Sequence, residues 1–126
     1  MDPNKLSNLF RKLQGAKVEA LSRDGEVVRM TLYHPALAVG IDPDFSRFFC
    51  TFSNCRDLYF QPFANSSTLL RQYPEILALD LRIRGGVPAP GGKIRIICSM
   101  ANTQNEGSMY ILADEFFAYD EAFDRL

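Results

Sequence analysis

The first apolar residues of the chain recur at helical spacing. A capping signal at Asp2 and Pro3 precedes them and Gly15 follows them, as expected at the two ends of a short helix. The apolar positions of this helix are Leu6, Leu9, Phe10 and Leu13. A helix of about three turns is marginally stable alone, so we expect its apolar face to be buried against the rest of the protein.

Strand-like alternation begins directly after Gly15. Residues 16–23 and 26–34 flank Asp24 and Gly25, a strong signal for a tight hairpin turn. The next stretch, 34–46, contains two prolines and a glycine, which predicts a connection with room for a turn of helix.

Residues 47–63 predict a second hairpin, in which bulky apolar side chains occupy adjacent positions. Phe48 stands beside Phe49, and Tyr59 stands beside Phe60. Neighbouring strand residues point to opposite faces of a sheet, so both faces of this hairpin are apolar. One short helix cannot cover both. We therefore expect the second face to be covered by the aromatic end of the chain or by another molecule.

Two further strands are predicted at 76–84 and 93–100, joined by a connection at 85–92 that is rich in glycine and proline. In the first of them, every second residue is apolar: Leu77, Leu79, Leu81 and Ile83. In the second, Ile94, Ile96, Cys98 and Met100 repeat this pattern. Both strands are therefore expected to have one buried and one wet face.

The remaining segments are less regular. Residues 64–74 predict a loop or a short helix, and the alternation of Met109, Ile111 and Ala113 predicts a last strand. The acidic tail from Asp114 onward carries four aromatic residues and favours a helix or an irregular packed segment over another full strand.

These elements predict a single α+β domain over residues 1–126. The N-terminal helix packs on a meandering antiparallel sheet of about six strands, because helix and successive hairpins are segregated along the chain. A small β-sandwich or a half-open barrel is the alternative architecture.

Composition narrows the classes of function. The chain has 47% hydrophobic and 23% charged residues, and its net charge of −1 argues against general attraction to nucleic acid or anionic membranes. No apolar run is long enough to cross a bilayer. Three cysteines, an odd number, favour free thiols and a cytoplasmic location. We expect no cofactor and no metal, since the single histidine is not at a familiar ligand spacing.

A basic patch is predicted on the wet face of the strands 76–84 and 93–100. Its members are Arg82, Arg84, Lys93 and Arg95. In a symmetric register Arg82 faces Arg95 and Arg84 faces Lys93, which would destabilise the sheet unless an anion relieves the repulsion. Asp80 or the acidic tail could do so within the chain. Phosphate, nucleic acid or an acidic protein could do so from outside.

The apolar second face of the 47–63 hairpin points to a protein interface. We expect a non-enzymatic interaction protein of regulatory, adaptor or immunity-type inhibitor character, by class analogy alone, with a protein or a second copy as partner and no membrane. The residues assigned to this interface are Phe49, Tyr59, Phe63, Asp114, Glu115, Asp120 and Glu121. Weak nucleic-acid or phosphate binding through the basic patch is an alternative.

A small enzyme or ligand-binding domain is the other alternative. His34, Asp42 and Asp44 lie close together in sequence, and a histidine beside carboxylates can perform general acid–base chemistry. The glycine-rich segment 85–92 lacks the lysine and hydroxyl residue of a phosphate-binding loop. With no catalytic motif, the sequence favours a binding function over an enzyme.

Overall fold

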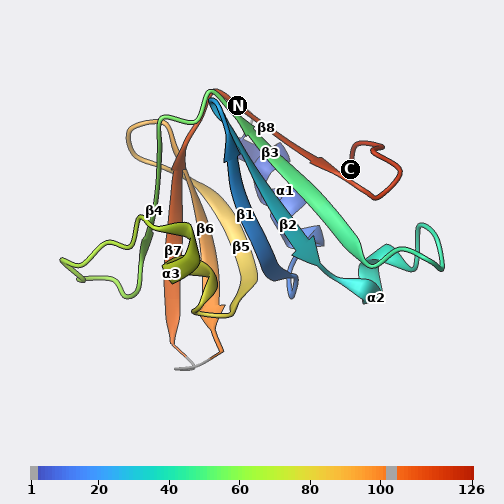
Figure 1. The fold of residues 1–126 in the computed structure, drawn as a ribbon, viewed down its shortest axis with the longest axis horizontal. Coiled ribbons are helices and arrows are strands. Elements are labelled where there is room, and N and C mark those ends of the chain that lie inside the picture. Colours follow the sequence, from blue (N-terminus) through green and yellow to red (C-terminus); the bar gives the residue numbers. More distant parts are fainter. Residues whose placement is uncertain (1–2, 102–104) are drawn as a thin grey trace.

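The computed structural model describes residues 3–101 and 105–126, in which three short helices accompany one antiparallel sheet of eight strands (Figure 1). The helices are α1 Pro3–Lys12, α2 Pro35–Ala38 and α3 Tyr73–Leu77. The strands are β1 Lys17–Asp24, β2 Val27–Tyr33, β3 Arg47–Ser53, β4 Asp57–Gln61, β5 Leu81–Ala89, β6 Lys93–Met100, β7 Glu106–Leu112 and β8 Glu115–Tyr119. The α+β class and the antiparallel sheet are thus confirmed, with more strands than expected.

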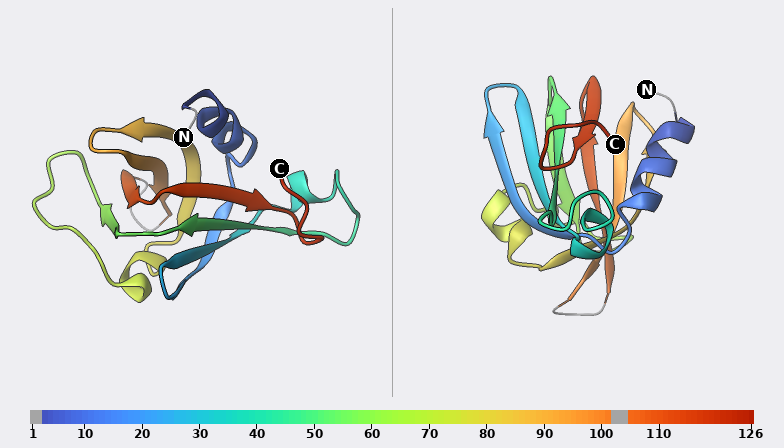
Figure 2. Two further views of the ribbon diagram at one scale, coloured as in Figure 1. Left: turned by 90° about the horizontal axis from the view of Figure 1, so that it is seen from above. Right: turned by 90° about the vertical axis from the view of Figure 1, so that its right-hand side faces the viewer.

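The sheet is open, and its strands follow the order β4-β7-β6-β5-β1-β2-β3-β8. Its two halves meet where β1 and β5 share the single register pair Lys17 and Arg82. The sheet curls strongly around this junction, and α1 lies inside the curl between β5 and β8 (Figure 2). The inner face of the sheet is therefore the core, and the outer face is the surface available to other molecules.

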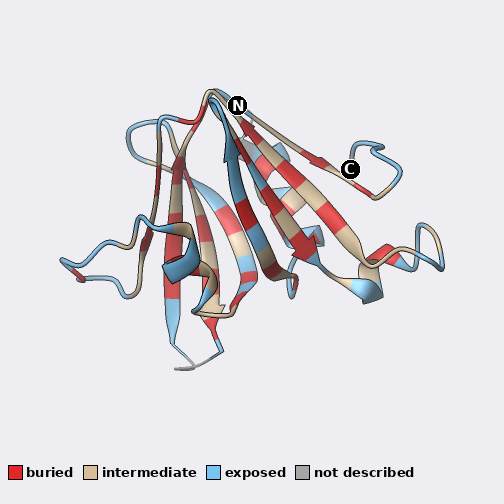
Figure 3. Ribbon diagram, in the orientation of Figure 1, coloured by how far each residue is buried: buried red, intermediate tan, exposed pale blue. Residues whose placement is uncertain are grey.

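Strand burial follows the two-residue period of a sheet with one wet face. Along β3 and β6, buried residues alternate with partly exposed ones, as the bands in Figure 3 show. The helix α1 covers the inner face with the buried side chains of Leu6, Phe10 and Leu13. The Phe10 ring stacks on Phe116 at 5.3 Å, and Phe116 stacks on Phe52 at 4.9 Å. This aromatic column joins the helix to both strands at the β8 end of the sheet.

The two local predictions at the start of the chain are confirmed. The helix ends before Gly15, which has a positive φ of 91°, and Gly25 has the positive φ of 62° expected in the turn between β1 and β2. The proposed cap Asp2 lies outside the described residues. The connection after β2 contains the short helix α2, which fits the turn of helix expected there.

The predicted hairpin at 47–63 is wrong, although both of its strands exist. β3 pairs with β2 and β8, whereas β4 pairs with β7 at the opposite end of the sheet order. The link between them is held by backbone bonds from Cys55 to Glu26 and from Arg56 to Leu112. The strand pattern predicted two strands correctly but could not tell which strands they would pair with.

Three other segments differ from the sequence-based expectation. Residues 73–77 are helical, and Asp80, with a positive φ of 53°, separates this helix from β5. Strand β5 then runs to Ala89 through the glycine-rich stretch that was expected to be a connection. The tail, expected to be helical or irregular, forms β8, because β3 offers it a complete antiparallel partner.

The close contact between α1 and β5 requires glycine at position 86, because a larger residue has no room there. A Cβ atom there would overlap the ring of Phe10, whereas a Cβ at neighbouring Gly85 would meet nothing within 4 Å. We expect Gly86→Ala to lower the free energy of unfolding by about 1–3 kcal/mol, because the added methyl group overpacks the core against Phe10. Urea denaturation measures this. Gly85→Ala is the matched control and should change stability by less than about 1 kcal/mol; equal losses would contradict the packing argument.

Candidate functional site

A row of large polar side chains crosses the outer face of β4, β7 and β6. Tyr59 of β4 is in register with Tyr110 of β7, and Tyr110 is in register with Arg95 of β6. Lys93 lies two residues before Arg95 and therefore on the same face. All four are partly exposed. We call these four residues the Tyr59–Tyr110 surface.

Close contacts organise this surface. The two tyrosine rings stack at 5.2 Å, and Lys93 Nζ donates a 2.9 Å hydrogen bond to Tyr59 Oη. This bond raises the pKa of Lys93, so the ammonium is charged at neutral pH. The guanidinium of Arg71 lies 5.1 Å from the Tyr59 ring and also forms an ion pair with Asp57. Tyr59 is thus held in place by two cations and a second ring.

A groove of about 490 Å³ opens beside Tyr110 and Arg95. Ile97, Glu106 and Phe63 also line it, and Phe63 is 60% exposed. Arg95 Nε donates a 2.9 Å hydrogen bond to Ser108 Oγ, which fixes the side chain along the strand. The groove therefore combines exposed apolar surface with an ordered cation.

The four predicted basic residues do share the outer face, but their register differs from the symmetric one. Arg82 is opposite Ser99 and Arg95 is opposite Val87, because a bulge shifts the pairing at Arg84. Lys93 is opposite Ala89. The repulsion expected within these four residues is thus relieved by register, although Arg82 is opposite another cation, Lys17 of β1. Asp80, which was a candidate anion, is 3.5 Å from Lys17.

None of these four cations forms an ion pair within residues 3–101 and 105–126. The five ion pairs of that part of the chain involve Lys17, Arg29, Arg47, Arg56 and Arg71. The basic patch therefore remains electrostatically available on the outer face of β5 and β6.

The other residues assigned to a partner interface lie elsewhere, around β3 and β8. Phe49 stacks at 5.9 Å on Phe123 of the tail. Asp120 is buried and accepts bonds from the backbone N–H groups of Ala122 and Asp124, which shape the final turn. These contacts give Phe49 and Asp120 a local structural role in the tail.

The remaining acidic residues are divided between contacts and solvent. Glu121 accepts bonds from the backbone N–H groups of Ser46, at 2.7 Å, and Arg47, at 3.3 Å. Asp114 forms a 3.0 Å ion pair with Arg56. Glu115 is exposed on the outer face of β8. Of the acidic candidates, Glu115 is thus the one with an open carboxylate in the described chain.

The proposed acid–base group is engaged in structure. His34 Nδ1 accepts a 3.3 Å bond from Leu37 N, which caps α2, and Nε2 lies 2.9 Å from the carbonyl oxygen of Gln14. Asp42 accepts a bond from the backbone N–H of Asp44. Both ring nitrogens of His34 have partners, so acid–base work there would require breaking one of these bonds.

No cluster of three or more histidine, cysteine, aspartate or glutamate side chains in the described ranges is arranged to hold a metal ion. Nor does any helix among the described residues have the length and apolar character needed to span a membrane.

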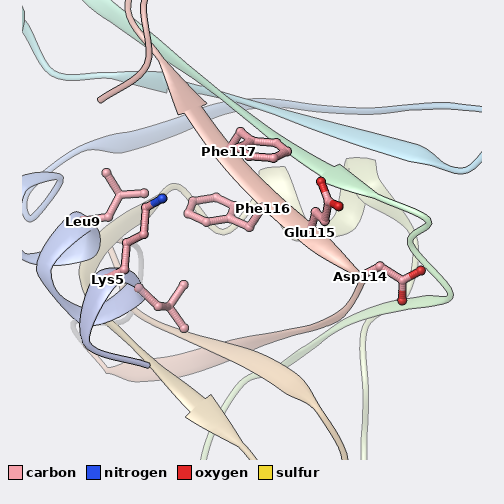
Figure 4. A pocket seen from close by; sticks show the side chains of 7 residues that line it. Lys5, Leu9, Asp114, Glu115, Phe116 and Phe117 are labelled. Carbon is pink, nitrogen blue, oxygen red and sulfur yellow. The ribbon is translucent and has the colours of Figure 1, made fainter. Parts of the chain in front are cut away.

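A second groove, of about 370 Å³, lies between α1 and β8 (Figure 4). Leu9 of the helix lies opposite Phe116, and Leu6 also lines the groove. Lys5 and Glu115 also line the groove. Sequence reasoning missed it because β8 was not expected to be a strand.

Two members of the outer-face site were also missed. Tyr110 occupies an outward position of the alternation at 109–113, so the pattern contained a signal for it. Arg71 belongs to an irregular segment, and nothing in the local pattern indicates that it reaches Tyr59.

Comparison with known proteins finds nothing similar: no family model, no curated protein and no solved structure matches the chain.

The three thiols are free and buried. Burial raises the pKa of Cys50 and of Cys98 to about 12, and burial is also the main cause of a raised pKa at Cys55. At pH 8 we therefore expect none of them to react rapidly with a thiol reagent in the folded protein, because the thiolate is the reactive form. All three should react in denaturant. Mass spectrometry of labelled peptides measures this, and rapid native labelling of Cys50 or Cys98 would contradict the buried positions.

Proposed function

We propose that this protein is a non-enzymatic interaction protein that binds an acidic surface of another protein through the Tyr59–Tyr110 surface and the adjoining groove. The observation that carries the proposal is the coincidence of a tyrosine stack with two cations, Lys93 and Arg95, that form no ion pair in the described chain. Tyrosine and arginine are enriched among the residues that dominate binding energy at protein interfaces.

The charge distribution supports an acidic partner. Arg82 and Arg84 extend the basic patch beyond Lys93 and Arg95 along the same outer face. Glu106 is the acidic residue that lines the groove. A partner carboxylate placed between these cations would gain charge-assisted hydrogen bonds, and the patch would accelerate association by electrostatic steering.

Preorganisation supports the tyrosines as anchors. Stacking, cation–π contacts and the Lys93 hydrogen bond already restrict Tyr59. A side chain that is ordered before binding loses less conformational entropy when the partner arrives. Phe63, exposed at the groove, adds apolar area that a partner can bury.

Nucleic acid or phosphate is the second candidate, favoured by the same four cations. Sequence-tolerant binding of single strands uses free aromatic faces on which bases stack. The Tyr59 ring instead has Tyr110 against it and both Arg71 and Lys93 close by. Asp57 and Glu106 lie at the same region, and the whole chain has a net charge of −1. A protein partner therefore agrees better with the surface.

A regulatory, adaptor or inhibitor-like role fits an interaction protein of this kind. An enzyme using His34, Asp42 and Asp44 has less support, since backbone groups already engage the side chains of His34 and Asp42.

The proposal is tested by comparing partner capture from native lysate by the wild-type protein, Tyr110→Ala and Arg95→Gln. We expect each variant to weaken the affinity for the captured partner at least about tenfold, as at other interface anchors. Arg29→Gln is the matched control, because Arg29 is an exposed arginine on β2, in the other half of the sheet. Thermal unfolding verifies that every variant is folded.

Raising the salt concentration from about 50 to about 500 mM should also weaken capture, because the contacts are charged and exposed. A partner retained equally by all four proteins would refute the assigned surface. Loss of all capture after nuclease treatment would favour the nucleic-acid alternative.

A further inference from the structure

The edge of the sheet at β8 is partly occupied by the end of the chain itself. Tyr119 and Arg125 form an antiparallel bridge, and Leu126 N donates a 3.0 Å hydrogen bond to the carbonyl oxygen of Ala118. Asp120 N donates a 3.0 Å bond to the carbonyl oxygen of Asp124. Residues 124–126 thus act as a very short additional strand beside the end of β8.

The rest of this edge continues into the groove of Figure 4. In an antiparallel sheet, the backbone groups of alternate residues point toward the same neighbour. The carbonyl of Ala118 points away from β3, since it accepts from Leu126. Phe116, two residues earlier, has the same orientation. Its N–H and C=O therefore face the groove between β8 and α1, beyond the backbone bond that joins Leu126 to Ala118.

The side chains around this edge present different chemistry on the two faces of the sheet. On the inner face, Leu6, Leu9 and Phe116 offer apolar walls. On the outer face, Glu115 is exposed and forms no ion pair in the described part of the chain. Lys5 belongs to α1, so its charge enters the groove from the side opposite Glu115.

The tail strand shows how an added strand uses these faces. The Arg125 guanidinium lies 4.1 Å from the Phe117 ring on the outer face, and Leu126 packs against the core. A cation outward and an apolar residue inward is therefore a pattern that this edge already accepts. In this register, the next inward position along β8 is beside Phe116, and the outward positions that follow Arg125 are beside Phe117 and then Glu115.

We propose that the groove between α1 and β8 binds an extended segment of another protein as an additional β-strand. The segment alternates apolar residues, which contact Leu6, Leu9 and Phe116, with lysine or arginine residues, one of which pairs with Glu115. Backbone hydrogen bonds to Phe116 supply the pairing, and the alternating side chains supply the specificity. This site is separate from the Tyr59–Tyr110 surface and goes beyond the function proposed above.

A second copy of the chain fits this edge less well. Edge-to-edge pairing of two sheets needs a continuous open strand. Here α1 stands beside the edge, and the tail covers its end at Ala118. The open part is the short stretch around Phe116, which suits a single extended segment.

The test uses a blocked hexapeptide of alternating lysine and valine, titrated into the full-length protein and followed by amide NMR and hydrogen exchange. We expect the Phe116 amide to shift and its exchange to slow at least about tenfold at saturation, as a new hydrogen bond forms. The same peptide with N-methylated valines keeps its side chains but cannot donate to the edge. It should bind at least about tenfold more weakly.

Charge reversal provides a matched pair of variants and peptides. Glu115→Lys should weaken the lysine–valine peptide and strengthen a glutamate–valine peptide, each by about threefold to tenfold, and thermal unfolding verifies the fold. Tyr110→Ala should leave the binding of the lysine–valine peptide unchanged, which separates this site from the Tyr59–Tyr110 surface.

Equal binding of the N-methylated peptide, or an unperturbed Phe116 amide, would overturn strand addition. Unchanged preference in Glu115→Lys would overturn the basic character of the partner. A dimer in sedimentation experiments, with the Phe116 amide protected before any peptide is added, would assign the edge to a second copy and overturn the proposal as well.

Discussion

The fold depends on one packing constraint: a curled sheet of eight strands has a large apolar inner face, and one ten-residue helix must close it. The column formed by Phe10, Phe116 and Phe52 meets this requirement, because it links α1 to the two strands at the far end of the curl. Gly86 allows the same helix to approach β5 closely. With the core closed from inside, the whole outer face of the sheet stays free of the protein's own helix α1.

Because α1 does not cover the outer face, residues of several strands can form a binding surface there. Tyr59, Lys93, Arg95 and Tyr110 come from three strands, and the pairing of β4 with β7 and of β7 with β6 brings them into one row. The acidic tail has a different role, which is to cover part of β3 and to hold its own turn in place. Phe123 covers Phe49 on the outer face, while Asp120 and Glu121 bind backbone groups that hold the tail in place. Three of the four acidic residues assigned to the interface thus hold structure in place, and none of the described carboxylates forms an ion pair with the basic patch.

The sequence was sufficient for features that depend on local chemistry. The first helix, its stop at Gly15 and the turn at Gly25 follow from spacing and backbone freedom, and the structure has all three. The sequence was insufficient for features that depend on contacts between segments far apart in the chain. Adjacent phenylalanines at 48–49 correctly indicated a strand with two apolar sides, but the same signature at 116–117 was discounted because acidic residues surround it. Glycines at 85–86 suggested a loop, whereas one of them provides close helix packing.

The candidate site shows the same division. Tyr59, Phe63, Lys93 and Arg95 were each recognisable as individual candidates, in two unrelated groups. Only the pairing of strands far apart in sequence unites them, and no periodicity within a strand specifies that pairing. The groove beside β8 could not be foreseen at all once the tail was expected to be helical or irregular.

Strands β3 and β8 are neighbours in the sheet but far apart in the sequence, and this has a consequence for folding during biosynthesis. Strand β3 is made early, but its outer neighbour β8 is the last strand in chain order. While ribosomes extend the chain, β3 therefore has a bare hydrogen-bonding edge beside the aromatic residues Phe49 and Phe52, and α1 lacks the ring of Phe116 against which it stacks. Completion of the core therefore waits until β8 has been synthesised, and the nascent chain depends on protection from aggregation until then.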